Sequence, residues 1–119
     1  MWQQRFPRRV YDSGEEPDPR FSLANERTFL AWIRTALAFF AAGVALNALE
    51  LSMPTWLLLT GSIVLIVTGL LAGGQAWLGW ARSERALRTG TALPAPGVAP
   101  LVTGGIVLVA ALLLIGLFW

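Results

Sequence analysis

The stretch RFSLANERTFLAWIRTALAFF, residues 20–40, decides the fold because it begins polar and becomes as apolar as a membrane span. It opens the first of three apolar blocks, at roughly 29–49, 54–80 and 101–119. Each block is close to the ~20 residues that a helix needs to cross about 30 Å of hydrocarbon. The blocks show almost no polar face, which a soluble helical bundle would need. We therefore expect an all-α membrane protein with three transmembrane helices.

The composition of the chain excludes most enzyme classes. Hydrophobic residues make up 55% of the sequence, and the mean hydropathy is +0.61. Cysteine and histidine are both absent, which removes disulfides, thiolate nucleophiles, thiolate metal sites and the usual general base. We expect no enzyme activity, no cofactor, no metal site and no nucleic-acid partner.

Two regions follow from the distribution of charge and proline. Residues 1–21 mix charges with prolines and lack apolar periodicity, so we predict a mobile cytoplasmic tail. Residues 22–119 form the predicted three-span membrane domain, with Ser22 as a plausible N-cap of the first helix. An Arg/Pro-rich loop at about 81–100 separates the second and third spans.

The arginines also predict the orientation in the membrane. Five of them lie in or just before the start of the first span and three follow the second, whereas the turn at 50–56 has none. Short loops rich in basic residues stay cytoplasmic, so we expect the N-terminus inside and the C-terminus outside. The tryptophans fit two interfacial belts, with Trp56 and Trp119 on the outer side and Trp32, Trp77 and Trp80 on the inner side.

The length of the first span places Arg34 below the membrane surface. If hydrocarbon began only after Arg34, the 15 residues from Thr35 to Leu49 would cover roughly 22 Å, well short of ~30 Å. The span therefore starts near Phe29, with Arg34 about five residues, or roughly 8 Å, inside. A charged side chain at that depth usually faces protein, water or a partner.

Helical projection puts Arg27 and Arg34 on one face, because seven residues return to within roughly 20° of the same direction. Small residues continue this face as a predicted helix-packing seam, namely Ala31, Ala38, Ala41 and Ala45. One interpretation is close helix packing with arginines that reach the headgroups. The other is a narrow passage or anion pocket lined by positive charge. The two interpretations can hold at different heights of one helix.

Two acidic residues near the inner face have predicted partners. Glu26 cannot easily pair with its neighbour Arg27, which points about 100° away, so we expect its partner from the basic cluster after the second span, Arg82, Arg85 and Arg88. Glu84 has Arg88 four residues later, which predicts a solvated pair within one helix. Another interpretation of the basic cluster is a topology signal whose arginines contact lipid phosphates.

Glycines in the later spans indicate close helix packing. Gly69 and Gly73 form a GxxxG pair within the apolar run of the second span, a spacing that lets helix backbones approach. Gly104, Gly105 and Gly116 of the third span admit the same interpretation. We attach no functional role to these glycines.

Two stretches carry a family resemblance. DPRFSLANERTFLAWIRTALAF, residues 18–39, closely resembles the YidH-like family of small bacterial inner-membrane proteins, the domain of unknown function numbered 202. WARSERALRTGTALP, residues 80–94, is similar to the arginine-rich stretch that follows the second span in that family. The resemblance implies three spans and a multi-pass location in the bacterial plasma (inner) membrane, but no settled activity.

A shorter segment, ANERTFL at residues 24–30, is similar to one in the membrane module of the vacuolar transporter chaperone, which makes polyphosphate and passes it across a membrane. There, several three-span subunits surround a passage with basic residues at its mouth. The resemblance implies that Arg20 and Arg27 face phosphate, with Glu26 as their structural counter-charge. Arg34 lies beyond the shared segment, so its role depends on the depth argument alone.

These observations leave two functional hypotheses. The first is an oligomeric integral membrane protein whose cationic cytoplasmic mouth, formed by Arg20, Arg27 and Arg34, binds or passes an anion such as a phosphate compound. The alternative is a non-conducting scaffold or accessory subunit of a larger membrane complex. The expected partners are the lipid bilayer and further copies of the chain. A proton-coupled exporter is excluded because no carboxylate lies near the middle of a span.

Overall fold

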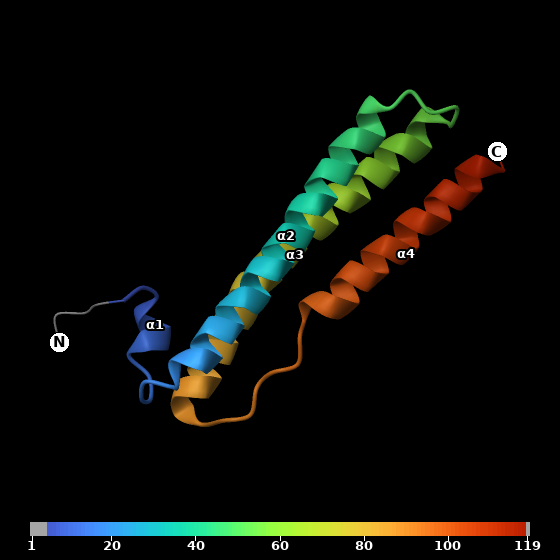
Figure 1. The fold of residues 1–119 in the computed structure, drawn as a ribbon. Coiled ribbons are helices and arrows are strands. Elements are labelled where there is room, and N and C mark those ends of the chain that lie inside the picture. The colour runs from blue at the N-terminus through green and yellow to red at the C-terminus, as the bar shows by residue number, and fades with distance from the viewer. Residues whose placement is uncertain (1–4, 119) are drawn as a thin grey trace.

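The computed structural model describes residues 5–118, which form three long helices and one short helix (Figure 1). The elements are α1 (Arg8–Tyr11), α2 (Pro19–Ala48), α3 (Thr55–Thr89) and α4 (Val98–Leu117). Each of α2, α3 and α4 is long and apolar enough to cross a membrane. The prediction of an all-α protein with three candidate spans is therefore confirmed. Trp119, which we predicted at the outer interface, lies outside the described residues.

The helix that contains the first span begins ten residues before the predicted hydrocarbon boundary. Asp18 is its N-cap, and the Asp18 carboxylate accepts a hydrogen bond of 2.9 Å from the backbone N–H of Arg20. Pro19 occupies the first helical position, where the missing N–H costs nothing. Ser22 therefore lies inside α2, and its prediction as the N-cap is wrong.

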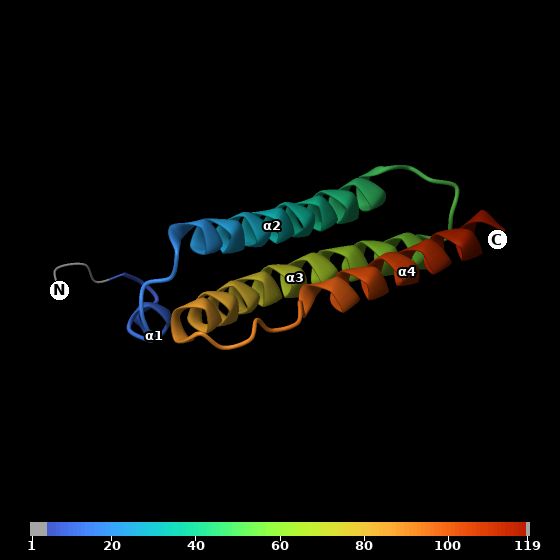
Figure 2. The same ribbon diagram turned by 60° about the horizontal axis from the view of Figure 1, so that its bottom comes forward.

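The first two long helices, α2 and α3, pack antiparallel over almost their whole length (Figure 2). The face of α2 that turns toward α3 carries four buried residues, Ala36, Phe39, Gly43 and Leu46. Gly69 of α3 meets this face so closely that a Cβ added there would lie 2.8 Å from the carbonyl oxygen of Ala36. Gly73 has more room, because its added Cβ would lie 4.0 Å from the Cβ of Ala36.

The third long helix, α4, packs along α3, so that α3 is the central helix of the three (Figure 2). An added Cβ at Gly105 would lie 2.6 Å from the side chain of Thr68, and one at Gly116 would lie 2.5 Å from that of Leu57. Gly104, by contrast, has nothing within 4 Å of its added Cβ. The described molecule is elongated, with principal extents of 61 × 26 × 20 Å.

From the length and register of α4 we infer one edge of the hydrocarbon region. The contacts of Gly105 and Gly116 set a register in which the first residues of α4 lie beside Gln75 of α3. The 20 residues of α4 correspond to about 30 Å, the thickness of the hydrocarbon core. From Gln75, α3 continues to Thr89 and projects about 21 Å further, at 1.5 Å per residue. We call this projecting part, with the start of α2 beside it, the arginine-rich end.

The segment before α2 folds against the arginine-rich end. Val10 of α1 is only 3% exposed, and the backbone N–H of Glu15 donates a hydrogen bond of 2.9 Å to the carbonyl oxygen of Arg88. We predicted a mobile tail over residues 1–21, but residues 5–18 form a short helix and a docked turn. The reason is that α3 extends far enough beyond the spans to provide a surface for them.

Candidate functional site at the arginine-rich end

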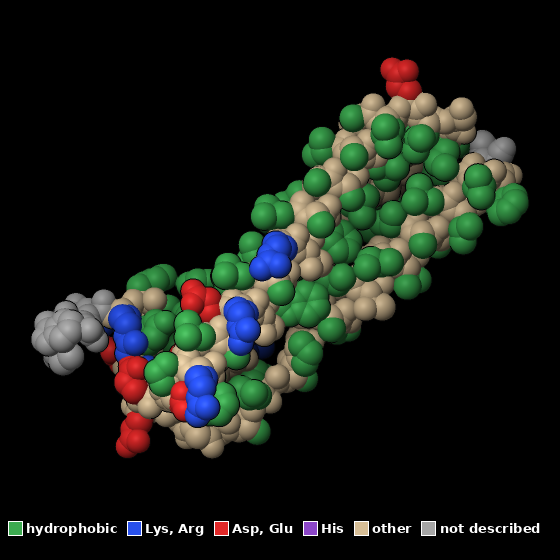
Figure 3. Space-filling view, viewed as in Figure 1, with side chains coloured by type: hydrophobic (Ala, Val, Ile, Leu, Met, Phe, Trp, Pro, Cys, Tyr) green, Lys and Arg blue, Asp and Glu red, His purple; other side chains and the backbone are tan. Residues whose placement is uncertain are grey.

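The three predicted mouth arginines follow one another on the exposed side of α2. Arg20, Arg27 and Arg34 are all exposed, and Figure 3 shows basic side chains that follow the near face of α2 from its start toward its middle. The alanines of the predicted packing seam are exposed as well, namely Ala31, Ala38, Ala41 and Ala45. Within one chain, the seam therefore does not pack against α3, and its face is open to lipid or to a second chain.

The first arginine of this row already has a carboxylate partner. A guanidinium N–H of Arg20 donates a hydrogen bond of 2.8 Å to the carboxylate of Asp18, and its Nε lies 3.2 Å from both carboxylate oxygens. These side-chain bonds, together with the bond from the Arg20 backbone N–H, lower the pKa of Asp18 below its ordinary value. Arg20 is therefore less available to an external anion than the sequence indicates.

The next two arginines have no such partner. Within residues 5–118, neither Arg27 nor Arg34 takes part in an ion pair or a side-chain hydrogen bond. The antiparallel register places Arg34 beside Ala72, three residues, or about 5 Å, inside the level of Gln75. This depth is smaller than the ~8 Å expected from length alone, and a long side chain can bridge it to reach the interface.

The predicted pair of Glu84 with Arg88 is wrong. Glu84 is only 3% exposed, and its carboxylate accepts hydrogen bonds of 2.6 Å from Ser22 Oγ and 3.2 Å from Asn25 Nδ2. The same amide of Asn25 donates a bond of 3.0 Å to the carbonyl oxygen of Trp80. No cation of the described chain forms an ion pair with Glu84. This carboxylate joins α3 to α2, and the spacing of Ser22 and Asn25 on one helical face was the sequence signal for it.

The other member of the predicted pair, Arg88, holds the N-terminal segment. Arg88 is 8% exposed. Its guanidinium donates to the carbonyl oxygens of Ser13 at 2.8 Å and Tyr11 at 2.7 Å, and to the carboxylate of Glu16 at 2.9 Å. Arg5 also pairs with Glu16. The two side chains that were predicted as one solvated pair thus make separate connections, one to α2 and one to residues 11–16.

The predicted partner of Glu26 is wrong as well. Glu26 is exposed and forms no ion pair with any residue between 5 and 118, including the basic cluster of Arg82, Arg85 and Arg88. It lies about 100° around the helix from Asn25, which faces α3, so its carboxylate points away from that helix. Glu26 instead shares a shallow groove on α2 with Arg20 and Arg27. Arg82 and Arg85 are exposed on α3.

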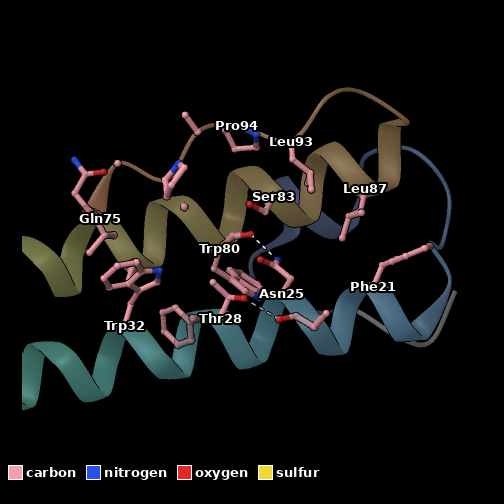
Figure 4. A pocket seen from close by; sticks show the side chains of 18 residues that line it. Phe21, Asn25, Thr28, Trp32, Gln75, Trp80, Ser83, Leu87, Leu93 and Pro94 are labelled. Atoms are coloured by element: carbon pink, nitrogen blue, oxygen red, sulfur yellow. Dashed lines mark hydrogen bonds between the residues drawn. The ribbon is translucent and has the colours of Figure 1, made fainter. Parts of the chain in front are cut away.

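A cavity of about 320 Å³ lies between α2, α3 and the segment at 93–98 (Figure 4). Aromatic side chains form much of its wall, including Trp32 from α2 and Trp80 from α3. Polar side chains also line it, namely Asn25, Thr28, Gln75 and Ser83. Sequence analysis missed this cavity because the 93–98 segment, which closes one side, has no periodic pattern that predicts where it lies.

The fold and these contacts define a class of protein. The chain is an integral membrane protein with three long helices and a structured polar extension at one end. In the part of the chain that the structure describes, no group of three His, Cys, Asp or Glu side chains could hold a metal ion. The arrangement offers exposed guanidinium groups, the buried carboxylate of Glu84 and the uncharged cavity beside residues 93–98.

Comparison with known proteins identifies the family. The model of DUF202, a domain of unknown function, matches residues 20–86, and the chain belongs to this family. It is 45% identical over 107 residues to inner membrane protein YidH of Escherichia coli K12, a match that covers 87% of this chain and 90% of that protein. It is also 49% identical over 81 residues to the uncharacterized protein Rv2272 of Mycobacterium tuberculosis H37Rv, covering 66% of each chain. No solved structure matches the chain.

These relatives confirm two expectations from the sequence. The YidH-like resemblance is correct, and with three candidate spans the protein is an inner-membrane protein. The family description assigns no activity.

Proposed function

We propose that this protein is an oligomeric inner-membrane protein that binds a phosphate-containing anion through Arg27 and Arg34. The observation that supports this most directly is that both arginines are exposed and lack partners in residues 5–118. From the register of the helices, we infer that Arg34 lies about 5 Å inside the edge of the hydrocarbon region. A charge at that position is costly unless it faces water, protein or an anion. Binding of an anion would therefore stabilise it.

The surroundings of the two arginines support an oligomer. The alanines below them leave a smooth face on which another helix can approach closely. A single chain whose helices are arranged around one central helix encloses no passage of its own, so a ring of arginines requires several copies. Rings of arginine or lysine are the usual source of anion selectivity in membrane pores. The same arrangement would allow an anion to pass through as well as bind.

The chemistry of the guanidinium group favours phosphate as the ligand. Its planar fork of N–H groups can donate two parallel hydrogen bonds to phosphate oxygens. Arg20 contributes less in this proposal than the sequence implies, because Asp18 holds it at 2.8 Å. The arginine-rich end is cytoplasmic in the proposed orientation, as the excess of basic residues there indicates. The protein acts in this proposal by binding, without catalysis.

Binding of inorganic phosphate and of short polyphosphate to the protein in lipid nanodiscs tests the proposal. We expect the double variant Arg27→Gln with Arg34→Gln to lose at least about tenfold in affinity, since one charge-assisted hydrogen bond contributes roughly 1.5–3 kcal/mol. The double variant Arg82→Gln with Arg85→Gln is the matched control, because it removes the same charge from exposed positions of α3. Equal affinities of the two double variants would contradict the proposal.

The scaffold alternative depends on the same exposed face of α2. If that face packs only against a larger partner protein, Ala38→Leu should abolish copurification of the partner, and neither arginine pair should affect phosphate binding. Chemical crosslinking of the purified protein alone separates the two functions. The anion-binding proposal requires crosslinked homo-oligomers, and the scaffold alternative requires none.

A further inference from the structure

We propose that the cavity between α2, α3 and residues 93–98 binds an uncharged lipid of the diacylglycerol type, drawn from the bilayer. The proposal is independent of anion binding, because neither Arg27 nor Arg34 lines the cavity. Its volume of about 320 Å³ lies at the lower end of the ~300–1,000 Å³ typical of ligand pockets.

The charge of the lining decides the class of ligand. None of the residues that line the cavity is Asp, Glu, Lys or Arg. A phosphate headgroup placed there would lose its hydration without gaining a cation, which is strongly unfavourable. A hydroxyl or ester group has no such requirement. The absence of charge therefore favours a lipid without a phosphate group.

Two polar side chains in the lining are available to such a ligand. Within residues 5–118, the amide of Gln75 and the hydroxyl of Ser83 form no hydrogen bond. Figure 4 shows Ser83 and Asn25 on facing helices, with Leu93 and Pro94 of the connecting segment beside them. Asn25 already donates through Nδ2 to Glu84 and Trp80, which leaves its carbonyl oxygen as an acceptor. These groups can bind the glycerol hydroxyl and the ester oxygens.

The position of the cavity explains how an apolar ligand can reach it. One end is lined by Gln75 and Val98, at the level where α4 begins and the hydrocarbon region ends. The other end is lined by Leu87, twelve residues further along α3, or about 18 Å away. A lipid can therefore enter from the bilayer, with its tails among the aromatic side chains of Trp32 and Trp80.

Two glycines of α3 provide a variant and its matched control. An added Cβ meets nothing within 4 Å at either Gly79 or Gly74, so both positions accept a larger side chain without a clash at the Cβ. Gly79 lines the cavity, whereas Gly74 does not. Gly79→Leu should fill the cavity, and Gly74→Leu should leave it open while making the same change to the same helix.

The experiment is a titration of the purified protein in detergent micelles with dioctanoylglycerol, followed by tryptophan fluorescence. We expect saturable binding to the wild type and to Gly74→Leu, and a loss of at least tenfold in affinity for Gly79→Leu. Dioctanoyl phosphatidic acid has the same chains and a charged headgroup. In the double variant Arg27→Gln with Arg34→Gln, which lacks the proposed anion site, it should bind at least tenfold more weakly than dioctanoylglycerol. Ser83→Leu, checked for helix content by circular dichroism, replaces Gly79→Leu if that variant does not fold.

Three results would overturn this proposal. They are the absence of saturable dioctanoylglycerol binding to the wild type, equal binding to both leucine variants of the glycines, and equal or tighter binding of phosphatidic acid to the double variant that lacks Arg27 and Arg34. None of them bears on anion binding, because the phosphatidic acid comparison is made without the proposed anion site.

Discussion

The close approach of α2 and α3 at Gly69 predicts different effects for alanine at Gly69 and Gly73, which lie one helical turn apart. A Cβ at Gly69 would lie 2.8 Å from the carbonyl oxygen of Ala36 and 2.8 Å from the ring of Phe40. The oxygen belongs to the backbone of α2, so the whole helix has to move away. A Cβ at Gly73 would be 4.0 Å from its nearest neighbour, which is ordinary van der Waals contact.

The expected difference in the free energy of unfolding follows from comparing Gly69→Ala with Gly73→Ala. Both replace glycine by alanine in the same helix, so the gain in helix propensity, up to about 1 kcal/mol, is common to them. Overpacking of a tight contact costs about 1–3 kcal/mol. Gly69→Ala should therefore be less stable than Gly73→Ala by about 1–3 kcal/mol, which corresponds to a roughly 5- to 150-fold difference in the unfolding equilibrium.

Reversible unfolding in mixed micelles with increasing sodium dodecyl sulfate measures this difference, with tryptophan fluorescence and far-ultraviolet circular dichroism as two readouts. We expect Gly73→Ala to unfold at or above the detergent fraction of the wild type and Gly69→Ala at a clearly lower fraction. Equal midpoints for the two variants would refute the close approach of α2 to Gly69 and the register derived from it.

Three further contacts give predictions at the arginine-rich end. Glu84→Ala should lower the free energy of unfolding by about 1.5–3 kcal/mol for each of the two lost hydrogen bonds. Glu84→Gln should lower it by less, because one acceptor oxygen remains. Equal denaturation midpoints for the two variants would contradict this. Arg88→Ala should expose residues 5–18 to chymotrypsin, whereas Arg85→Ala, which removes an exposed charge from the same helix, should leave cleavage as slow as in the wild type. Arg20 lowers the pKa of Asp18 in the folded protein. The ionised Asp18 therefore contributes fully to folding stability at neutral pH, and this contribution is lost as the pH falls through the folded-state pKa. A carboxyl titration by NMR should show this midpoint rising in Arg20→Gln, and an unchanged midpoint would show that the pair does not form.

The spans could be predicted from sequence because their signal is local. An apolar block of about 20 residues indicates a membrane helix whatever its neighbours are. Each of the predicted blocks at 29–49, 54–80 and 101–119 accordingly falls largely within one long helix, α2, α3 or α4. The helix ends were less accurate. α2 starts at Pro19 because Asp18 caps it. Hydropathy does not predict this start, because the cap is a polar residue outside the apolar block.

The side-chain partners at the arginine-rich end could not be predicted in the same way. The spacing of Glu84 and Arg88 is the one typical of a pair within a helix. Each side chain instead bonds to a residue elsewhere in the chain, Glu84 to Ser22 and Arg88 to Glu16. These contacts join residues 62 and 72 positions apart, and pairing within a single helix gives no information about such distances. That Arg27 and Arg34 share one face of α2 was predictable, because helical periodicity alone defines it.

The projection of α3 beyond the bilayer has a consequence for local stability. From Gln75 to Thr89 it adds about 14 residues, close to the length below which an isolated helix is marginal in water. The buried carboxylate of Glu84 and the guanidinium of Arg88 therefore supply much of the order in this part. Its backbone amides should exchange with solvent through local opening while the spans stay folded. Protection against hydrogen exchange should thus fall along α3 from Gln75 to Thr89, and the steepest fall should lie beyond Arg88.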